Sequence, residues 1–343
     1  MYILEITWPL CYFGLKLCFF LGQLLAPTPT QGQTSIIQQP SIISIYTATE
    51  LASIGQKAEF PLDGTYQLEN DIDLAGVLLS PIGDEKRPFQ GKLYGNQHTI
   101  THLSINTSQE HTGLFGVLGK GALLQEVYLK EGQVQGGAKT GLLVGYNQGE
   151  LRNCCVMGHV WGSNNVGGLV GLNDSSGKIY STQAFCKVVG KHYEVGGLVG
   201  CNLGYVIDSH VHTEVIGVRL VGGLVGTNDE TGRLLHCVAL GKVTGQHWVG
   251  GLVGHNWFRG RIIHCMAAVE TIGKEYVGGL AGFNYAEAMI AASTAIGPVL
   301  GHSYTGMFVG GNRGTITYKP RLKEDQWRNR LQKPCLLIDL LAG

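Results

Sequence analysis

The sequence has little charge and no excess of either sign. Charged residues make up 15% of the 343 residues, Lys+Arg and Asp+Glu each total 25, and the pI is about 7.2. Binding of nucleic acid requires a local excess of Lys and Arg that neutralises phosphates, and the sequence shows no basic stripe. It also shows no acidic block. The composition therefore argues against nucleic acid as a partner.

The motifs of common catalytic and metal sites are missing from the sequence. There is no HExxH and no GxSxG, and GGAKTG at 136–141 lacks the GK[ST] of a phosphate-binding loop because Ala138 follows the glycines. The cysteines are odd in number and lack CxxC spacing, which argues against a disulfide framework or a zinc site. They are Cys11, Cys18, Cys154, Cys155, Cys186, Cys201, Cys237, Cys265 and Cys335. We predict no catalytic, cofactor-binding or metal-binding residues, and expect that the protein is not an enzyme.

Long hydrophobic runs are also scarce, and the longest stands near the N-terminus. The stretch from Leu10 to Ala26 is apolar and aromatic, but Lys16 interrupts it, and it falls short of the ~18 residues that span a membrane. It fits a secretory signal peptide with Ala26 at the cleavage position, although Glu5 upstream and Pro27 after the cut are unfavourable. A membrane anchor and an irregular start are the alternatives. We expect a secreted or cell-surface protein that touches a membrane only through this leader.

Glycine is abundant, with 52 residues against 10 prolines, and it recurs in one phrase. The phrase reads GLLVGYN, GGLVGLN, GGLVGCN, GGLVGTN, GGLVGHN, GGLAGFN and GMFVGGN, ending at Asn147, Asn173, Asn202, Asn228, Asn256, Asn284 and Asn312. The steps between these asparagines are 26, 29, 26, 28, 28 and 28 residues. Repeats of this length indicate a solenoid, a propeller or a repeat array.

A second pattern lies between the copies: a large aliphatic residue, two variable ones, a small one, then Val-x-Gly. Short apolar patches bounded by glycine indicate strands, because helices would contain several interior glycines at about 1 kcal/mol each. Stacking the copies in register places each residue ~4.8 Å from its equivalent. The stack predicts a buried column of Leu143, Leu169, Leu198, Leu224, Leu252, Leu280 and Phe308. Because Leu169 and Val170 both belong to apolar columns, their alternation does not decide which one points inward.

Two polar or small columns follow from the same register. The seven asparagines can bond to one another through their side-chain amides. The small residues predict a tight interior corner: Cys154, Thr182, Ser209, Cys237, Cys265 and Ala292.

The fold predicted from these patterns is all-β, a right-handed parallel β-solenoid of about seven to eight repeats of ~28 residues. We assign residues 1–40 to the leader and a linker, 41–130 to N-terminal capping coils, 131–318 to the repeats and 319–343 to a C-terminal tail or cap. Within the capping coils, Thr47 and Glu50 have capping-box spacing and predict a small helix over 47–54. Residues 66–74 and 92–106 have the alternation of strands.

The phrase GGLVGxN at this spacing, with the intervening aliphatic-x-x-(Cys/Ser/Thr) and Val-x-Gly, resembles the GLUG repeat of bacterial surface and secreted proteins. The resemblance covers 140–312. That family includes adhesin-like proteins and the non-catalytic region of certain IgA-cleaving metallopeptidases, whose HExxH is not found in this sequence. The resemblance implies a solenoid and an extracellular, adhesive or display role.

Two constellations could carry chemistry. His236-Cys237 and His264-Cys265 occupy matching positions in adjacent repeats and could bind a soft metal. Neighbouring residues of a strand point to opposite faces, so a buried Cys column beside an exposed His column is the other interpretation. Asp71 and Asp73 could form a carboxylate pair for glycosidic chemistry or calcium, but acidic residues are also common at solenoid turns.

The leading functional hypothesis is a non-catalytic adhesion, binding or display module whose partner is a host or cell-surface protein or a glycan. The expected exposed contacts are Trp161, His192, Tyr193, Trp248, Tyr276 and Tyr304, which could equally be surface residues without a role. The alternatives are a polysaccharide-active enzyme on a parallel β-helix and a non-catalytic fragment of a larger secreted peptidase.

Overall fold

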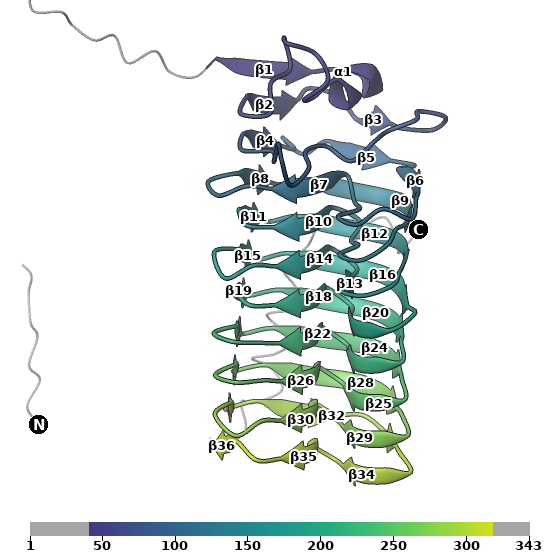
Figure 1. Ribbon diagram of the computed structural model, residues 1–343, viewed down its shortest axis with the longest axis vertical. Coiled ribbons are helices and arrows are strands. Elements are labelled where there is room, and N and C mark those ends of the chain that lie inside the picture. The colour runs from purple at the N-terminus through teal and green to yellow at the C-terminus, as the bar shows by residue number, and fades with distance from the viewer. Residues whose placement is uncertain (1–40, 318–343) are drawn as a thin grey trace, which may run out of the picture. The chain divides into compact units, whose positions relative to one another are not determined.

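The computed structural model describes residues 41–317, which form a parallel β-solenoid of about nine turns of ~28 residues (Figure 1). The predicted all-β solenoid is therefore confirmed. Every strand pairs in parallel with the equivalent strand of the next coil, and the pairs form four sheets, which we call A to D. The predicted leader at 1–40 and the tail at 319–343 lie outside the described residues.

Sheet A carries the aliphatic residue that begins the second pattern. Leu151, Ile179 and Val206 are Cα partners along it, and all three are fully buried. Its strands, in spatial order, are β1 (Ile42–Ile45), β2 (Thr65–Leu68), β4 (Lys92–Tyr94), β8 (Leu123–Gln125), β11 (Glu150–Arg152), β15 (Lys178–Tyr180), β19 (Tyr205–Ile207), β23 (Arg233–Leu235), β27 (Arg261–Ile263), β31 (Met289–Ala291) and β36 (Thr315–Thr317).

Sheet B contains the longest strands and includes the Val-x-Gly of the second pattern. Its path is β3 (Ile72–Asp73), β5 (Thr99–Thr101), β9 (Tyr128–Gln135), β12 (Cys155–Gly162), β16 (Gln183–Gly190), β20 (His210–Ile216), β24 (Val238–Thr244), β28 (Met266–Ile272) and β32 (Thr294–Ile296). In addition, β6 (Ser104–Asn106) pairs with β9, and β33 (Val299–Leu300) pairs with β28.

Sheets D and C hold the two halves of the glycine-rich phrase. Sheet D consists of β13 (Val166–Gly167), β17 (Tyr193–Gly196), β21 (Arg219–Gly222), β25 (His247–Gly250), β29 (Glu275–Gly278) and β34 (Ser303–Gly306). Sheet C consists of β7 (Phe115–Leu118), β10 (Val144–Asn147), β14 (Val170–Asn173), β18 (Val199–Asn202), β22 (Val225–Asn228), β26 (Val253–Asn256), β30 (Ala281–Asn284) and β35 (Val309–Asn312). Each coil thus has up to four short strands.

The chain bends between β13 and β14, and this bend decides the orientation that the sequence left open. Leu169 lies in the bend and Val170 begins β14, and both side chains are fully buried. A corner does not follow the strict alternation of a strand, so neighbouring residues can both face the core. The predicted leucine column is buried from Leu143 to Leu280 and ends at the partly buried Phe308.

The asparagine ladder forms as predicted. Asn202 Nδ2 donates to Asn228 Oδ1 at 2.8 Å, and Asn228 Nδ2 donates to Asn256 Oδ1 at 2.9 Å. The ladder runs unbroken from Asn147 to Asn312, and its members up to Asn284 are fully buried. The amides of Asn173, Asn202, Asn228 and Asn256 also donate to a backbone carbonyl, such as Gly232 O at 3.0 Å from Asn228, which helps to satisfy these buried polar groups.

The glycine that precedes the variable residue of the phrase permits a close approach between coils. A Cβ atom on Gly226 would lie 2.5 Å from both the backbone nitrogen of Val195 and the carbonyl oxygen of Gly200. These neighbours are backbone atoms and cannot rotate away, which explains the glycine at this position.

The prediction of the small column is wrong for one residue, Ala292. Ile262 pairs with Ile290, so Ser293 holds the position that Cys265 has in the coil before, and its Oγ accepts a hydrogen bond from the Cys265 backbone N–H at 3.1 Å. Ala292 instead takes the left-handed conformation that His264 has, with φ values of 47° and 54°. A slip of one residue moves a side chain from the buried corner to the turn.

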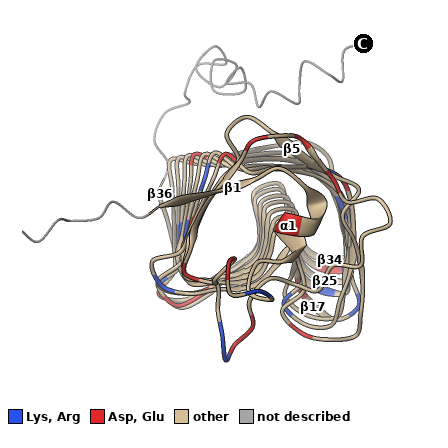
Figure 2. Cartoon of the chain, turned by 90° about the horizontal axis from the view of Figure 1, so that it is seen from above, with Lys and Arg blue, Asp and Glu red and all other residues tan. Residues whose placement is uncertain are grey.

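The N-terminal end of the stack carries the predicted helix, α1 (Ala48–Ala52), seen over the coils in Figure 2. The capping box is present: Glu50 N–H donates to Thr47 Oγ1, and the Glu50 carboxylate accepts from Thr47 N–H. The strands predicted at 66–74 and 92–106 occur as β2 and β3 and as β4, β5 and β6. The boundary placed after residue 130 falls inside β9. Within residues 41–317, no helix has the length and hydropathy to cross a membrane.

Candidate functional site: the seam between sheets C and D

Sheets D and C meet along one side of the stack, and we call the line of side chains at this junction the seam. Each coil contributes three positions: the residue two before the glycine pair, the variable residue of the phrase, and the residue after the ladder asparagine. In one coil these are Trp248, His255 and Trp257. Ring centroids lie 6.4 Å apart for Trp248 and His255, and 4.5 Å apart for His255 and Trp257. The seam therefore gathers residues separated by nine positions in the chain.

The first position of the seam has a left-handed backbone in every coil. Its φ values lie between 48° and 60° for His111, Lys139, Asn165, Glu194, Leu220, Trp248, Tyr276 and Tyr304. This conformation costs an L-residue roughly 1–2 kcal/mol, and Gly or Asn adopts it most readily. The backbone conformation therefore does not explain why large side chains stand at this position.

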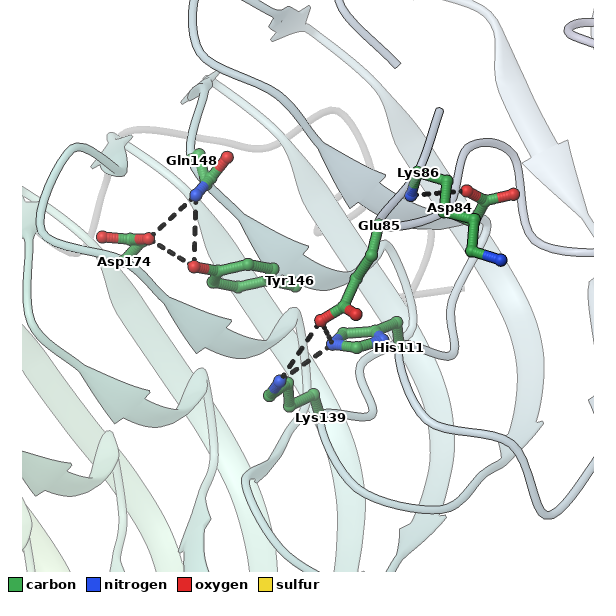
Figure 3. Close-up of polar contacts among 8 residues, drawn as sticks. All are labelled: Asp84, Glu85, Lys86, His111, Lys139, Tyr146, Gln148 and Asp174. Carbon is green, nitrogen blue, oxygen red and sulfur yellow. Dashed lines mark hydrogen bonds and ion pairs between the residues drawn. The ribbon is translucent and has the colours of Figure 1, made fainter. Parts of the chain in front are cut away.

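The seam begins with a charged cluster (Figure 3). Glu85, from the loop between β3 and β4, reaches His111 Nε2 at 3.3 Å and Lys139 Nζ at 3.9 Å. Lys139 Nζ lies 2.9 Å from His111 Nε2. Burial and the nearby Lys139 ammonium lower the pKa of His111, so its neutral ring can accept a hydrogen bond from the lysine.

A second polar group follows in the next coils. The Tyr146 hydroxyl donates to Asp174 Oδ2, and Gln148 Nε2 donates to the same oxygen at 3.0 Å. Burial raises the pKa of Tyr146 to about 12. Burial opposes ionisation of Asp174 as well, but the hydrogen bonds from Tyr146, Gln148 and Ser175 outweigh it and lower its pKa to about 2. The pair is thus a neutral phenol and a carboxylate at neutral pH.

The middle of the seam is less charged. Glu194 accepts a hydrogen bond from Asn165 Nδ2, and the side chains of Cys201 and Thr227 lie beside it. Burial raises the pKa of Glu194. Burial also raises the pKa of the Cys201 thiol well above its usual range, so the thiol stays protonated and unreactive at neutral pH.

The far part of the seam, which we call the aromatic section, is built from rings of successive coils. Two ladders stack along it. Trp248, Tyr276 and Tyr304 form the first, with centroids 6.1 and 4.5 Å apart and planes within 7°. Trp257 and Tyr285 form the second, with centroids 4.2 Å apart and planes at 26°.

Two rings of the variable position contact both ladders: His255 stacks on Trp248 at 23° and Phe283 is tilted by 46° to Tyr285, but each meets a ring of the other ladder at a steep angle. Phe283 makes 80° with Tyr276, and His255 makes 89° with Tyr285. His255 is 7% exposed, and burial lowers its pKa to about 4, so the imidazole is neutral at neutral pH. The exposed Phe258 packs edge-on against Trp257 and completes the aromatic section.

The structure brings together three of the six residues predicted as exposed contacts. Trp248, Tyr276 and Tyr304 form one ladder, although only Tyr304, at 60%, is strongly exposed. His192 and Tyr193 are exposed beside Arg219, and Trp161 lies in β12 against His159.

Sequence reasoning missed His255, Trp257, Phe258, Phe283 and Tyr285. The available signal was the aromatic or imidazole residue on both sides of the asparagine in two consecutive phrases.

The His-Cys pairs do not share one environment. Cys237 and Cys265 are fully buried, whereas the rings of His236 and His264 pack on the outside with centroids 5.4 Å apart. A buried Cys column beside a partly exposed His column is therefore confirmed, although the pairs lie at a left-handed corner before β24 and β28 rather than on a strand. Within the described residues, no three His, Cys, Asp or Glu side chains form a group able to hold a metal ion.

Asp71 and Asp73 are used in separate turn contacts. Asp71 Oδ1 accepts a hydrogen bond from Thr99 N–H at 2.8 Å, and Asp73 Oδ1 accepts from Ala75 N–H at 2.9 Å. Asp73 also pairs with His102 Nδ1 at 2.7 Å. Their hydrogen bonds are those of acidic residues at solenoid turns.

Comparison with known proteins finds a structure with a similar fold and two relatives that match only part of this chain. No family model matches the chain. It is 36% identical over 135 residues to Halomucin of Haloquadratum walsbyi, covering 36% of this chain and 2% of that protein. It is 38% identical over 101 residues to a "Putative Gly-rich membrane protein" of Evansella cellulosilytica, covering 26% of this chain and 12% of the relative. The chain thus spans only a small part of either relative.

A solved structure covers most of the solenoid. It is the crystal structure of a protein from Bacteroides ovatus described as a "putative immunoglobulin A1 protease", with a TM-score of 0.52 and 18% identity. The match covers 85% of this chain and 87% of that one. At this identity the likeness shows the fold alone, and the predicted membership of the repeat family stays a prediction.

Proposed function

We propose that this chain is a secreted or cell-surface solenoid of GLUG-type repeats that binds a partner through the seam and catalyses no reaction. The observation that carries the proposal is the aromatic section. None of Trp248, Trp257, Tyr276, Phe283, Tyr285 and Tyr304 belongs to the hydrophobic core, which is made of other side chains. Aromatic residues that a fold does not need, gathered on one exterior line, are typical of binding surfaces.

The titration of the polar part of the seam supports a non-catalytic role. A general acid or base works best with a pKa near the operating pH. Tyr146 and Asp174, with pKa values of about 12 and about 2, stay in one protonation state at neutral pH. Their hydrogen bond therefore joins two coils and is poorly suited to proton transfer.

The relatives support an extracellular location. One is named a halomucin and the other a membrane protein, and both are much longer than the region that matches. A glycine-rich repeat solenoid inside a long surface protein would serve as a binding or display module. Cell fractionation with N-terminal sequencing of the mature chain would test this, since a cytoplasmic chain with Met1 retained contradicts it.

Binding through the seam can be tested with the labelled full chain on arrays of extracellular proteins and of glycans. Trp257→Ala should weaken binding by about tenfold or more, as expected for a central aromatic contact. Tyr193→Ala is the matched control, because Tyr193 is an exposed aromatic residue of sheet D outside the aromatic section. Equal loss with both variants would contradict a role for the seam.

Absence of catalysis needs its own assay. The purified chain should release no product from immunoglobulin A1 or from a panel of polysaccharides over prolonged incubation. Cleavage of either substrate that survives repurification would favour the enzyme alternatives and overturn the non-catalytic role.

A further inference from the structure

We propose that the aromatic section of the seam binds a neutral polysaccharide whose chain lies along the solenoid axis. This inference rests on the proposed binding function and names the ligand class. It depends on five properties of the aromatic section: its cost to the backbone, its repeat, its ring orientations, its free polar groups and the charges around it.

The fold does not explain the choice of residues. Trp248, Tyr276 and Tyr304 stand in left-handed conformations, with φ of 53°, 54° and 48°, where the bulky ring is a conformational outlier. The position equivalent to Trp248 is Glu194 two coils earlier and Asn165 in the coil before that, so the coil accepts polar residues without a ring here. Strained residues that the core does not use are candidates for function.

The repeat of the rings matches a repeating ligand. Each coil adds one ring to the first ladder, at centroid steps of 6.1 and 4.5 Å. The second ladder runs beside it through Trp257 and Tyr285 at 4.2 Å. These steps are of the size of one sugar ring, so a linear glycan can meet equivalent groups from coil to coil.

The ring orientations suit an amphipathic ligand. Stacking covers the ring faces within each ladder, so the ladders present mainly ring edges, while Phe283 stands at 80° to Tyr276 and His255 at 89° to Tyr285. The faces of aromatic rings are electron-rich and the edges are electron-poor. Sugar hydroxyl oxygens fit the edges, and sugar C–H groups fit the exposed rings of Tyr304 and Phe258.

The section also carries polar groups that the protein leaves to solvent. Among the described residues, no hydrogen bond engages the indole N–H of Trp248 or Trp257, or the hydroxyls of Tyr276, Tyr285 and Tyr304. Five such groups along aromatic ladders can donate to sugar hydroxyls. A lipid or an aliphatic peptide surface would leave them without partners, at a cost in affinity.

The charges around the section favour a neutral ligand. Arg259 pairs with Glu287 at 3.1 Å, and His247 pairs with Glu275 at 3.0 Å. The neighbouring Asp229 and Glu230 add negative charge, which disfavours acidic polymers. Arg313 holds the third seam position after Tyr285, but among residues 41–317 the positive charges near these rings do not exceed the negative ones that would repel uronate or sulfate groups.

The test uses the full chain and soluble polysaccharides of both kinds: a β-glucan, a mannan and a xylan as neutral probes, and polygalacturonate and hyaluronate as acidic ones. Affinity electrophoresis and tryptophan fluorescence should show binding to at least one neutral probe that does not change between low and high salt. Stronger binding of an acidic probe that salt abolishes would overturn the inference.

Matched variants locate the site. Trp248→Asn and Tyr276→Asn keep a residue that tolerates the left-handed turn, and each should weaken binding by about tenfold or more. His236→Asn makes the same kind of change at a left-handed position outside the seam and should leave the affinity unchanged. Unchanged affinity in all three variants would place the ligand elsewhere and overturn the inference.

If a variant does not fold, the binding site can still be located on the unaltered chain. In hydroxyl-radical footprinting, a bound neutral glycan should protect Trp248, Trp257 and Tyr285 but not Trp161. If glycans fail to bind while a protein on the arrays binds and protects the same rings, the ligand class is wrong and the binding function stands. If no probe of either class binds, both the inference and the proposed function are overturned.

Discussion

Replacing Asn228 by alanine tests whether the asparagine ladder stabilises the stack. Asn228 is fully buried, accepts a hydrogen bond from Asn202 at 2.8 Å, and donates to Asn256 Oδ1 at 2.9 Å and to Gly232 O at 3.0 Å. A typical hydrogen bond contributes about 1 kcal/mol net, and a buried group left without a partner costs about 1–3 kcal/mol. Three bonds are lost, so we expect the free energy of unfolding to fall by about 3–5 kcal/mol.

The measurement is equilibrium unfolding of the full chain in urea, followed by circular dichroism. Asn312→Ala is the control, because Asn312 ends the ladder and is exposed, so water can replace its bonds to Gly314 and Asn284. It should cost below about 1 kcal/mol. A loss under about 1 kcal/mol in Asn228→Ala, or equal losses in the two variants, would refute the reasoning that burial makes the ladder stabilising.

Three further predictions concern packing, protonation and thiol access. Gly226→Ala places a Cβ 2.5 Å from two backbone atoms and should destabilise the fold by more than about 3 kcal/mol in thermal or urea unfolding. The control is Gly76→Ala, which has open space around it and should cost only about 1 kcal/mol because of its φ of 74°. A similar loss in both would argue against the clash. Burial lowers the pKa of His255 to about 4, so the unfolded chain takes up a proton that the folded chain refuses as pH falls from about 6.5 toward 4. The wild type should therefore lose up to about 3 kcal/mol more stability than His255→Phe over that range, and parallel pH profiles of the two would contradict this. The six buried thiols from Cys154 to Cys265 should resist iodoacetamide in the native chain and react in urea, as measured by peptide mass spectrometry. The reason is that burial raises the pKa of Cys186 to about 12 and that of Cys237 well above its usual range. Rapid native labelling of Cys237 would show that the corner opens.

The sequence predicts the ladders well because solenoid contacts are periodic. Asn202 and Asn228 are separated by 26 residues and pair directly, so reading the period is enough to pair them. The same holds for Leu151 and Ile179 in sheet A. The error at Ala292 arose in the second pattern, where the small residues Ala-Ala-Ser stand side by side at 291–293, and one residue of register changed a buried corner into a turn.

The seam was predicted only in part, for a physical reason. Trp248, Tyr276 and Tyr304 were chosen as single aromatic residues beside the phrase, and the period alone places them in a column. Their proximity to His255 and Trp257 depends on the bend between sheets D and C, whose angle is not encoded in the repeat length. The contact of Glu85 with Lys139 depends on a loop that belongs to no repeat.

The amino-acid sequence by itself determined the period and all but one residue of the predicted buried columns, since identical neighbours must stack when copies of one unit are repeated. The tertiary structure alone decided how the coil bends at its corners. That bend buries both Leu169 and Val170 and brings three separate columns together on one seam. Contacts between coils follow from periodicity, whereas contacts within a coil follow from the corner angles, and the candidate binding site consists of both.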